Sequence, residues 1–273
     1  MKYISSAIVS LSLLIFSTSC TDTGSDNDAG EQAEMADKEK ADDAADDLKK
    51  YKVYKAPESH HYPDASLSME SPSEEMVQPG EVEFDYTVTN FELKQQTPDA
   101  KERGIANSDN GQHIHFIVNN GPYSAQYESS FTKKMEEGHY VILSFLSRSY
   151  HESVKNGNAH TVKQLTVGDP KDKKEFNPNA EHLFYSRPKG TYSGKDTEKL
   201  MLDFFLMNTA ISENGNKVRA TINGEEHMIT EWAPHYIEGL GKGEMKITLE
   251  LLDASGNLIP GPFNKVERTV TLK

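Results

Sequence analysis

The chain of 273 residues is acidic, with 43 aspartates and glutamates against 29 lysines and arginines and a formal net charge of −14. This sign of charge argues against nucleic acid as a partner. A single cysteine excludes an intramolecular disulfide framework.

The N-terminal residues predict export. Residues 4–16 form an apolar run that is too short to span a bilayer comfortably and is typical of a secretory signal. The small residues directly before Cys20 resemble the lipobox of bacterial lipoproteins, although Ser17 stands where leucine is usual. We therefore expect a signal peptide over residues 1–19 and a lipid on the thiol of Cys20. The alternative is an ordinary signal peptide with an incidental cysteine.

Residues 20–57 are predicted to form a disordered tether. Between residues 21 and 48 the chain holds eleven acidic and only two basic residues. Such a segment cannot bury enough apolar surface to offset the loss of conformational entropy on ordering. The aspartates soon after the cysteine resemble the acidic signal of Bacteroidetes-type lipoproteins. That resemblance implies a lipid-anchored protein of the outer membrane, exposed at the cell surface.

The rest of the chain repeats itself. Asn90 matches Asn208 at an offset of 118, and Asn119 matches Asn223 at an offset of 104. Because the second offset is kept almost unchanged to the end of the chain, we interpret the pattern as a tandem duplication. Copy one, the linker and copy two are assigned to residues 58–169, 170–180 and 181–273.

Each copy shows short alternating segments separated by Gly, Pro, Asn and Asp turns. The pattern predicts an all-β fold, with two tandem immunoglobulin-like β-sandwich domains after the disordered tether. The His-x-His segment, the Asn-Gly turn, the Gly-His pair and a late histidine of copy one resemble an exported bacterial Ig-like module. Gln112 replaces the usual glycine before His113, and Tyr150 replaces the usual aspartate before His151. Uncharacterised Bacteroidetes lipoproteins, some labelled phosphopeptide-binding, are similar.

The histidines of copy one form a candidate metal site. By analogy with the alternating residues 217–222 of copy two, His113 and His115 point outward on one face of a sheet, together with His139. Two imidazoles at this spacing are about 7 Å apart at the backbone and are able to ligate one Zn²⁺ or Cu²⁺. His151, in the following loop, is a further ligand candidate. The alternative is that these histidines pack on a half-buried face or contact a partner.

Two more features of copy one distinguish it from copy two. Val141, Leu143 and Phe145 form an apolar outward stripe, which needs a cover from the linker, copy two or a partner chain. Residues 95–110 have no counterpart in copy two, and they are either tolerated loop length or a binding loop.

Tyr123, Arg148 and Tyr150 are candidates for ligand contact, and Arg148 is suited to a single anion. Residues 147–153 hold serine, histidine and glutamate, but adjacent loop residues seldom build a catalytic triad, and no Gly-x-Ser-x-Gly elbow is present. We therefore expect no enzymatic activity.

The sequence thus predicts a lipid-anchored envelope protein that binds a protein, peptide or glycan through the histidine-rich face and loops of copy one. One alternative is a Zn- or Cu-binding periplasmic or surface protein. A phosphopeptide or anion binder is a weaker alternative.

Overall fold

The computed structural model describes residues 51–172 and 176–273. The predicted signal peptide, Cys20 and most of the predicted tether lie outside the described residues. The described parts are almost entirely β, as predicted, with one α-helical turn, α2 (Ala100–Arg103), and one 3-10 turn, η1 (Gly194–Thr197). Neither helix in these ranges is long and apolar enough to cross a membrane.

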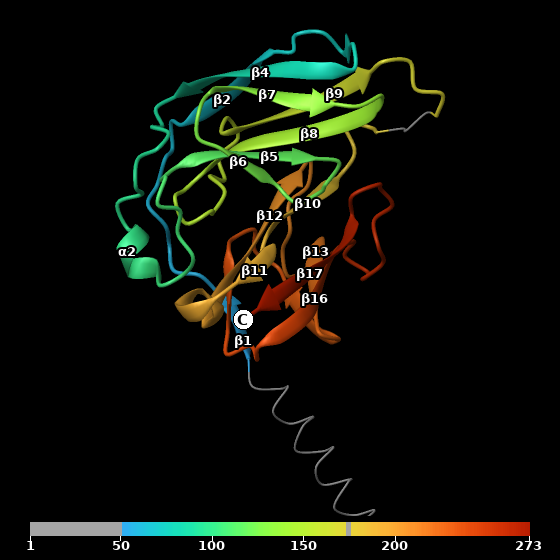
Figure 1. The fold of residues 1–273 in the computed structure, drawn as a ribbon. Helices are drawn as coiled ribbons and strands as arrows, with labels where there is room; N and C mark the ends of the chain where they lie inside the picture. Colours follow the sequence, from blue (N-terminus) through green and yellow to red (C-terminus); the bar gives the residue numbers. More distant parts are fainter. Residues whose placement is uncertain (1–50, 173–175) are drawn as a thin grey trace, which may run out of the picture. The chain divides into compact units, whose positions relative to one another are not determined.

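Copy one is a sandwich of two sheets (Figure 1). Its strands are β2 (Ser66–Ser71), β3 (Met76–Val77), β4 (Gly80–Thr89), β5 (His113–Val118), β6 (Ser124–Gln126), β7 (Ser130–Met135), β8 (Gly138–Ser147) and β9 (His160–Val167). One sheet has the order β2-β4-β7 and the other the order β3-β9-β8-β5-β6. Between the sheets, alternate residues of facing strands bury a core that includes Phe84, Phe116 and Ile142.

Copy two repeats this plan. Its strands are β10 (His182–Arg187), β11 (Gly190–Tyr192), β12 (Lys199–Met207), β13 (Lys217–Ile222), β14 (Glu225–Ile229), β15 (His235–Glu238), β16 (Gly243–Leu252) and β17 (Lys265–Leu272). In both copies the first strand pairs antiparallel in one sheet, and its continuation pairs parallel with the last strand in the other sheet. The Ig-like sandwich architecture is therefore present twice.

The matched asparagines do the same work in both copies, which supports the duplication. Asn119 and Asn223 both adopt a φ of 49° at the end of the third long strand. The side-chain oxygen of Asn119 accepts a hydrogen bond from the Val141 amide, and that of Asn223 accepts one from the Lys246 amide. Each asparagine thus closes a turn while fixing the neighbouring strand.

The structure corrects the N-terminal limit of the folded region. Residues up to 57 were expected to be disordered, but β1 (Lys52–Lys55) pairs antiparallel with β15 and completes the four-stranded sheet β1-β15-β12-β10 of copy two. Val53 packs against the core of that copy. Because the pairing joins segments about 180 residues apart in sequence, no local sequence pattern predicts it.

Copy two covers the apolar outer stripe of copy one, one of the three covers considered above. Leu143 and Phe145 of β8 pack with Phe184 of β10 and Phe205 of β12 in a separate buried cluster. The Phe145 and Phe205 rings are stacked, with centroids 5.2 Å apart. The two sandwiches therefore share a third apolar layer between their sheets. We call the whole interface between the two copies, with this layer and the polar residues around it, the seam.

A strap of residues 56–62 runs from β1 to copy one and is held by the residues that copy two lacks. Arg103 of α2 donates hydrogen bonds to the carbonyls of Pro57 and Glu58. Asp99 accepts a hydrogen bond of 2.8 Å from the His60 amide. The extra segment of copy one, residues 95–110, is therefore a structural clamp on the strap.

Candidate metal centre

Strand β5 carries two histidines on one face. Ile114 and Phe116 enter the core of copy one, so His113 and His115 point to the opposite side of the sheet. This is the register that the repeat predicts. That side is not a solvent-facing surface, however, because copy two covers it and both imidazoles are fully buried. The prediction that these histidines form an open face that contacts a ligand is therefore wrong.

His151 joins these two from the loop after β8. Because β8 pairs antiparallel with β5 and Ser147 lies opposite His113, the chain leaving β8 stays beside the start of β5. His151 adopts a φ of 69°, and its amide donates a hydrogen bond of 2.8 Å to the Arg148 carbonyl. Histidine enters this left-handed region more readily than most residues do. The tight turn aims its ring at His113.

Three ring nitrogens converge. Nε2 of His113 lies 3.0 Å from Nε2 of His115 and 3.1 Å from Nδ1 of His151. One nitrogen from each ring falls within a group whose members all lie within 4.8 Å of one another. In a tetrahedral site with zinc–nitrogen bonds of ~2.0–2.1 Å, two ligand nitrogens are about 3.3 Å apart. The cluster therefore has the donor type and spacing of a three-histidine metal site.

The two buried rings are oriented through their other nitrogens. Nδ1 of His113 donates to the Gly111 carbonyl at 2.8 Å, so the lone pair of the neutral ring is on Nε2, facing the cluster. Nδ1 of His115 lies 3.1 Å from the Ser186 hydroxyl of β10. Copy two thereby helps to orient a candidate ligand that belongs to copy one.

Burial keeps the three imidazoles neutral. Loss of hydration lowers the pKa of His113 to about 4 and lowers the pKa values of His115 and His151 well below their usual range. The positive charges of Arg187 and Lys189 act in the same direction on all three rings. Since a metal ion binds the neutral imidazole, the cluster is ready to ligate at neutral pH.

Two hydroxyl groups border the converging nitrogens. The Tyr123 hydroxyl lies 3.2 Å from Nδ1 of His151, and the Ser147 hydroxyl lies 3.1 Å from Nε2 of His115. The Tyr123 ring also stacks on His115, with centroids 3.6 Å apart. Among the described residues, no carboxylate belongs to this group. A metal ion would thus have three neutral ligands and one position for water, a hydroxyl group or an added ligand.

His139, the remaining histidine of the predicted set, lies elsewhere. It is on the same face of β8 as Phe145, the partner of His115, but six residues nearer the start of the strand. At about 3.3 Å per residue, this separates the two sites by about 20 Å. The His139 ring contacts the Thr166 hydroxyl and the Asp172 carbonyl instead. The predicted face is right, but His139 as a ligand of the same metal ion is wrong.

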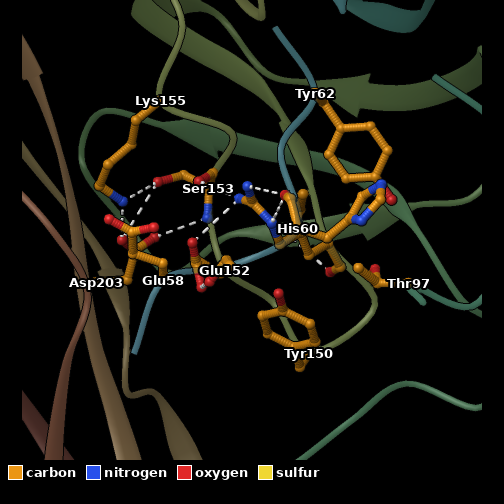
Figure 2. A network of polar contacts seen from close by, with 12 residues as sticks. Glu58, His60, Tyr62, Thr97, Tyr150, Glu152, Ser153, Lys155 and Asp203 are labelled. Atoms are coloured by element: carbon orange, nitrogen blue, oxygen red, sulfur yellow. Dashed lines mark hydrogen bonds and ion pairs between the residues drawn. The ribbon is translucent and has the colours of Figure 1, made fainter. Parts of the chain in front are cut away.

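Arg148, expected to contact a ligand or anion, is committed within the chain. It forms a buried ion pair with Glu152 and donates hydrogen bonds to the carbonyls of His60 and Ser153. Figure 2 shows this network between the strap and the loop after β8. A guanidinium already neutralised and hydrogen-bonded in this way is a poor anion receptor.

Tyr150 is equally occupied. Its ring is fully buried, and its hydroxyl donates to Asp99 at 3.1 Å. Of the three predicted ligand-contacting residues, Tyr123 alone lies at the histidine cluster, while Arg148 and Tyr150 hold the strap and the clamp.

Copy two supplies residues near the cluster that sequence reasoning missed: Ser186, Arg187 and Lys189. Sequence comparison aligns Arg187 with Ser71 of copy one, a position without special chemistry. No local pattern reveals that this end of β10 faces the histidines, because the contact depends on how the two copies dock. The cationic position of Lys189 beside Tyr123 is visible in the folded chain alone.

Comparisons with known proteins give distant likenesses. No protein-family model matches the chain, and no curated protein matches it. Among solved structures, fibronectin(III)-like modules of CbhA from Clostridium thermocellum are 12% identical, with 76% of this chain and 94% of that chain covered and a TM-score of 0.27. The central fibronectin-III array of RIM-binding protein is 10% identical, with 80% and 72% covered and a TM-score of 0.24.

A surface glycan-binding protein, SGBP-B of Bacteroides ovatus, solved with a mixed-linkage heptasaccharide, is 11% identical. The alignment covers 76% of this chain and 47% of that chain, with a TM-score of 0.23. At such identities and TM-scores these likenesses carry no information about the ligand of this chain.

Proposed function

We propose that this chain is a non-catalytic binding protein whose ligand is a transition metal ion, Zn²⁺ or Cu²⁺, held by His113, His115 and His151. The observation that carries the proposal is the convergence of three neutral imidazole nitrogens at the seam. Imidazole suits both metals, and the lack of carboxylates in the cluster disfavours Mg²⁺ and Ca²⁺, which prefer oxygen ligands.

Burial decides what kind of ligand the histidines take. His113 and His115 have no exposed surface, and only His151 is partly accessible. A protein, peptide or glycan would have to separate the two copies to touch these rings, whereas an ion needs only a path past His151. The binding role expected from the sequence is therefore proposed for an ion.

The proposal includes the location of the protein in the cell. A positively charged start, a short apolar run and small residues before Cys20 support export and lipid attachment at the outer membrane. Mass spectrometry of the N-terminal peptide from membrane fractions tests this, with Cys20→Ser as control. Recovery of an unmodified Cys20 in the mature chain would contradict the anchor.

Calorimetric titration of the metal-free chain with Zn²⁺ and with Cu²⁺ at pH 7.5 tests the metal site. All samples carry Cys20→Ser, so that no thiol competes. We expect one equivalent to bind, and we expect His151→Asn to weaken binding by at least about tenfold, because even the loss of a group that only hydrogen-bonds to a metal ligand has an effect of that size. Asparagine is chosen because it tolerates the left-handed conformation of position 151.

His139→Gln is the matched control, since this histidine lies on the same face of β8 but away from the cluster. Its metal affinity should equal that of the parent chain. Binding that is unaffected by His151→Asn, or that is lost in His139→Gln, would contradict the assignment.

A further inference from the structure

Three cations gather beside the histidine cluster at the seam: Arg187, Lys189 and Arg268. The Lys189 ammonium lies 4.1 Å from the centroid of the Tyr123 ring, and the Arg187 guanidinium lies 5.9 Å from it. Because His115 stacks on one face of Tyr123 at 3.6 Å, Lys189 occupies the other face. Tyr123 therefore separates the histidines from a positively charged group.

These cations have no acidic partner among the described residues. Every other strongly buried arginine there is paired: Arg103 with Asp99, and Arg148 with Glu152. Arg187 and Arg268 are only 7% and 8% exposed, yet neither forms an ion pair with a described residue, nor does Lys189. The two arginines lie against tyrosine rings, the three cations lie near one another, and Arg268 also donates hydrogen bonds to backbone carbonyls.

Unpaired charges of one sign are costly to bury, and their mutual repulsion adds to that cost. This cost is reflected in the pKa of Lys189, which is lowered by burial and, in addition, by the charges of Arg187 and Arg268. None of the acidic residues in the described ranges lies beside these cations, although a single carboxylate would relieve the repulsion. A mobile anion would have the same effect.

Unused hydrogen-bond donors point the same way. Of the five N–H groups of Arg187, one donates to the Tyr192 hydroxyl at 2.8 Å, and the described residues offer the others no side-chain or backbone acceptor. The Tyr185 hydroxyl is buried and has no hydrogen-bond partner among the described residues; burial raises its pKa, although the charges of Arg268 and Arg187 act in the opposite direction. A planar guanidinium with free N–H groups matches an oxyanion, which it binds in a bidentate manner.

We propose that Arg187 and Lys189, with Arg268 behind them, form a binding site for a small inorganic oxyanion at the seam between the two copies. The guanidinium of Arg187 provides the directional hydrogen bonds, and Lys189, which is partly accessible, provides the entry point. Arg268 donates to the carbonyls of Asn120 and Gly121 and contributes its charge. The site uses no histidine, so it does not rest on the metal proposal.

Titration of the metal-free chain with inorganic phosphate and with sulfate, at fixed ionic strength and with a chelator present, tests this site. The readouts are calorimetric binding and the shift in melting temperature. We expect saturable binding of one oxyanion and a rise in melting temperature, because a ligand that binds only the folded state stabilises it. Sodium chloride at matched ionic strength should give no saturable shift.

Lys189→Gln should weaken phosphate binding by about tenfold or more, since a charge-assisted hydrogen bond is lost. Arg187→Gln should abolish binding, and because Arg187 is buried, Lys189→Gln keeps the test informative if that variant fails to fold. Lys199→Gln is the matched control: this ammonium also lies over a tyrosine ring, 4.9 Å from Tyr236, but near paired groups elsewhere. His151→Asn should bind phosphate as the parent does.

Absence of saturable phosphate or sulfate binding in the parent chain overturns the proposal. Equal affinity in the parent and Lys189→Gln chains also overturns it, because the oxyanion would then sit elsewhere. Loss of metal binding in His151→Asn with unchanged phosphate binding, and loss of phosphate binding in Lys189→Gln with metal binding retained, would show that the two sites are separate, so that either proposal can fail without the other.

Discussion

The side-chain oxygen of Asn120 in copy one accepts a hydrogen bond of 2.8 Å from the Tyr185 amide in copy two. The same side chain donates to the carbonyls of Leu183 and Phe263. One asparagine at the β5–β6 turn therefore satisfies three backbone groups of the other copy. Because Tyr185 directly precedes Ser186, which contacts His115, this contact also sets the position of the histidine cluster.

Asn120→Gly should remove these hydrogen bonds without straining the turn, since copy two has Gly224 at the matched position. Leaving buried backbone groups unpaired should lower the free energy of unfolding by about 3 kcal/mol. Urea denaturation followed by circular dichroism measures the change. Asn223→Gly, at an exposed position in the corresponding turn of copy two, should lose about 1 kcal/mol or less. Equal losses in both variants would show that Asn120 has no special role at the seam.

Asp203 is a second connection across the seam. Its buried carboxylate pairs with Lys155 and accepts a hydrogen bond of 3.0 Å from the Ser153 amide (Figure 2). Asp203→Asn leaves Lys155 without its partner in a mostly buried position, so the free energy of unfolding should fall by about 3 kcal/mol. Lys246→Gln, which breaks an exposed pair with Glu267, should change it by less than about 1 kcal/mol. A small effect of Asp203→Asn would mean that water compensates both groups.

The fold was largely predictable, because the duplication supplies two readings of one pattern. Alternation in residues 217–222 of copy two indicated correctly which face of β5 carries His113 and His115. Position along the strand was harder: His139 shares that face but lies at the other end of β8, since the strand register is set by pairings that the sequence does not display. Whether the face is open or covered depends on the docking of the copies, through long-range contacts such as that of Asn120 with Tyr185.

The stability of the metal-free chain should fall as pH decreases from about 6.5 to about 4. The pKa of His113 in the folded chain is lowered to about 4, while in the unfolded chain it should be near its usual ~6.5. Between these values the unfolded state binds more protons, so the free energy of unfolding rises with pH in this window. At pH 5 the loss attributable to His113 should be about 2 kcal/mol. His115 and His151 shift in the same direction and add to it.

Urea denaturation at pH 7.5 and pH 5, with a chelator present, measures this dependence. His151→Asn removes one of the titrating groups and should reduce the pH effect, whereas His139→Gln should leave it unchanged. A parent chain that is equally stable at both pH values would show that the cluster accepts protons freely, and so that its rings are less buried than the structure places them.

Metal and oxyanion should bind cooperatively if both proposed sites exist. A bound Zn²⁺ adds positive charge beside Arg187 and Lys189, so an oxyanion should raise zinc affinity, and zinc should raise oxyanion affinity by the same factor.

The variant Lys189→Gln should therefore change zinc affinity in two opposite ways. Without phosphate it removes a repelling charge, and zinc should bind more tightly than in the parent chain. It also weakens phosphate binding, so saturating phosphate should raise zinc affinity more in the parent chain than in the variant. Calorimetric zinc titrations of both chains, with and without phosphate at matched ionic strength, give the four affinities. Zinc affinity in the parent chain that is the same with and without phosphate would show that the two sites do not interact across Tyr123.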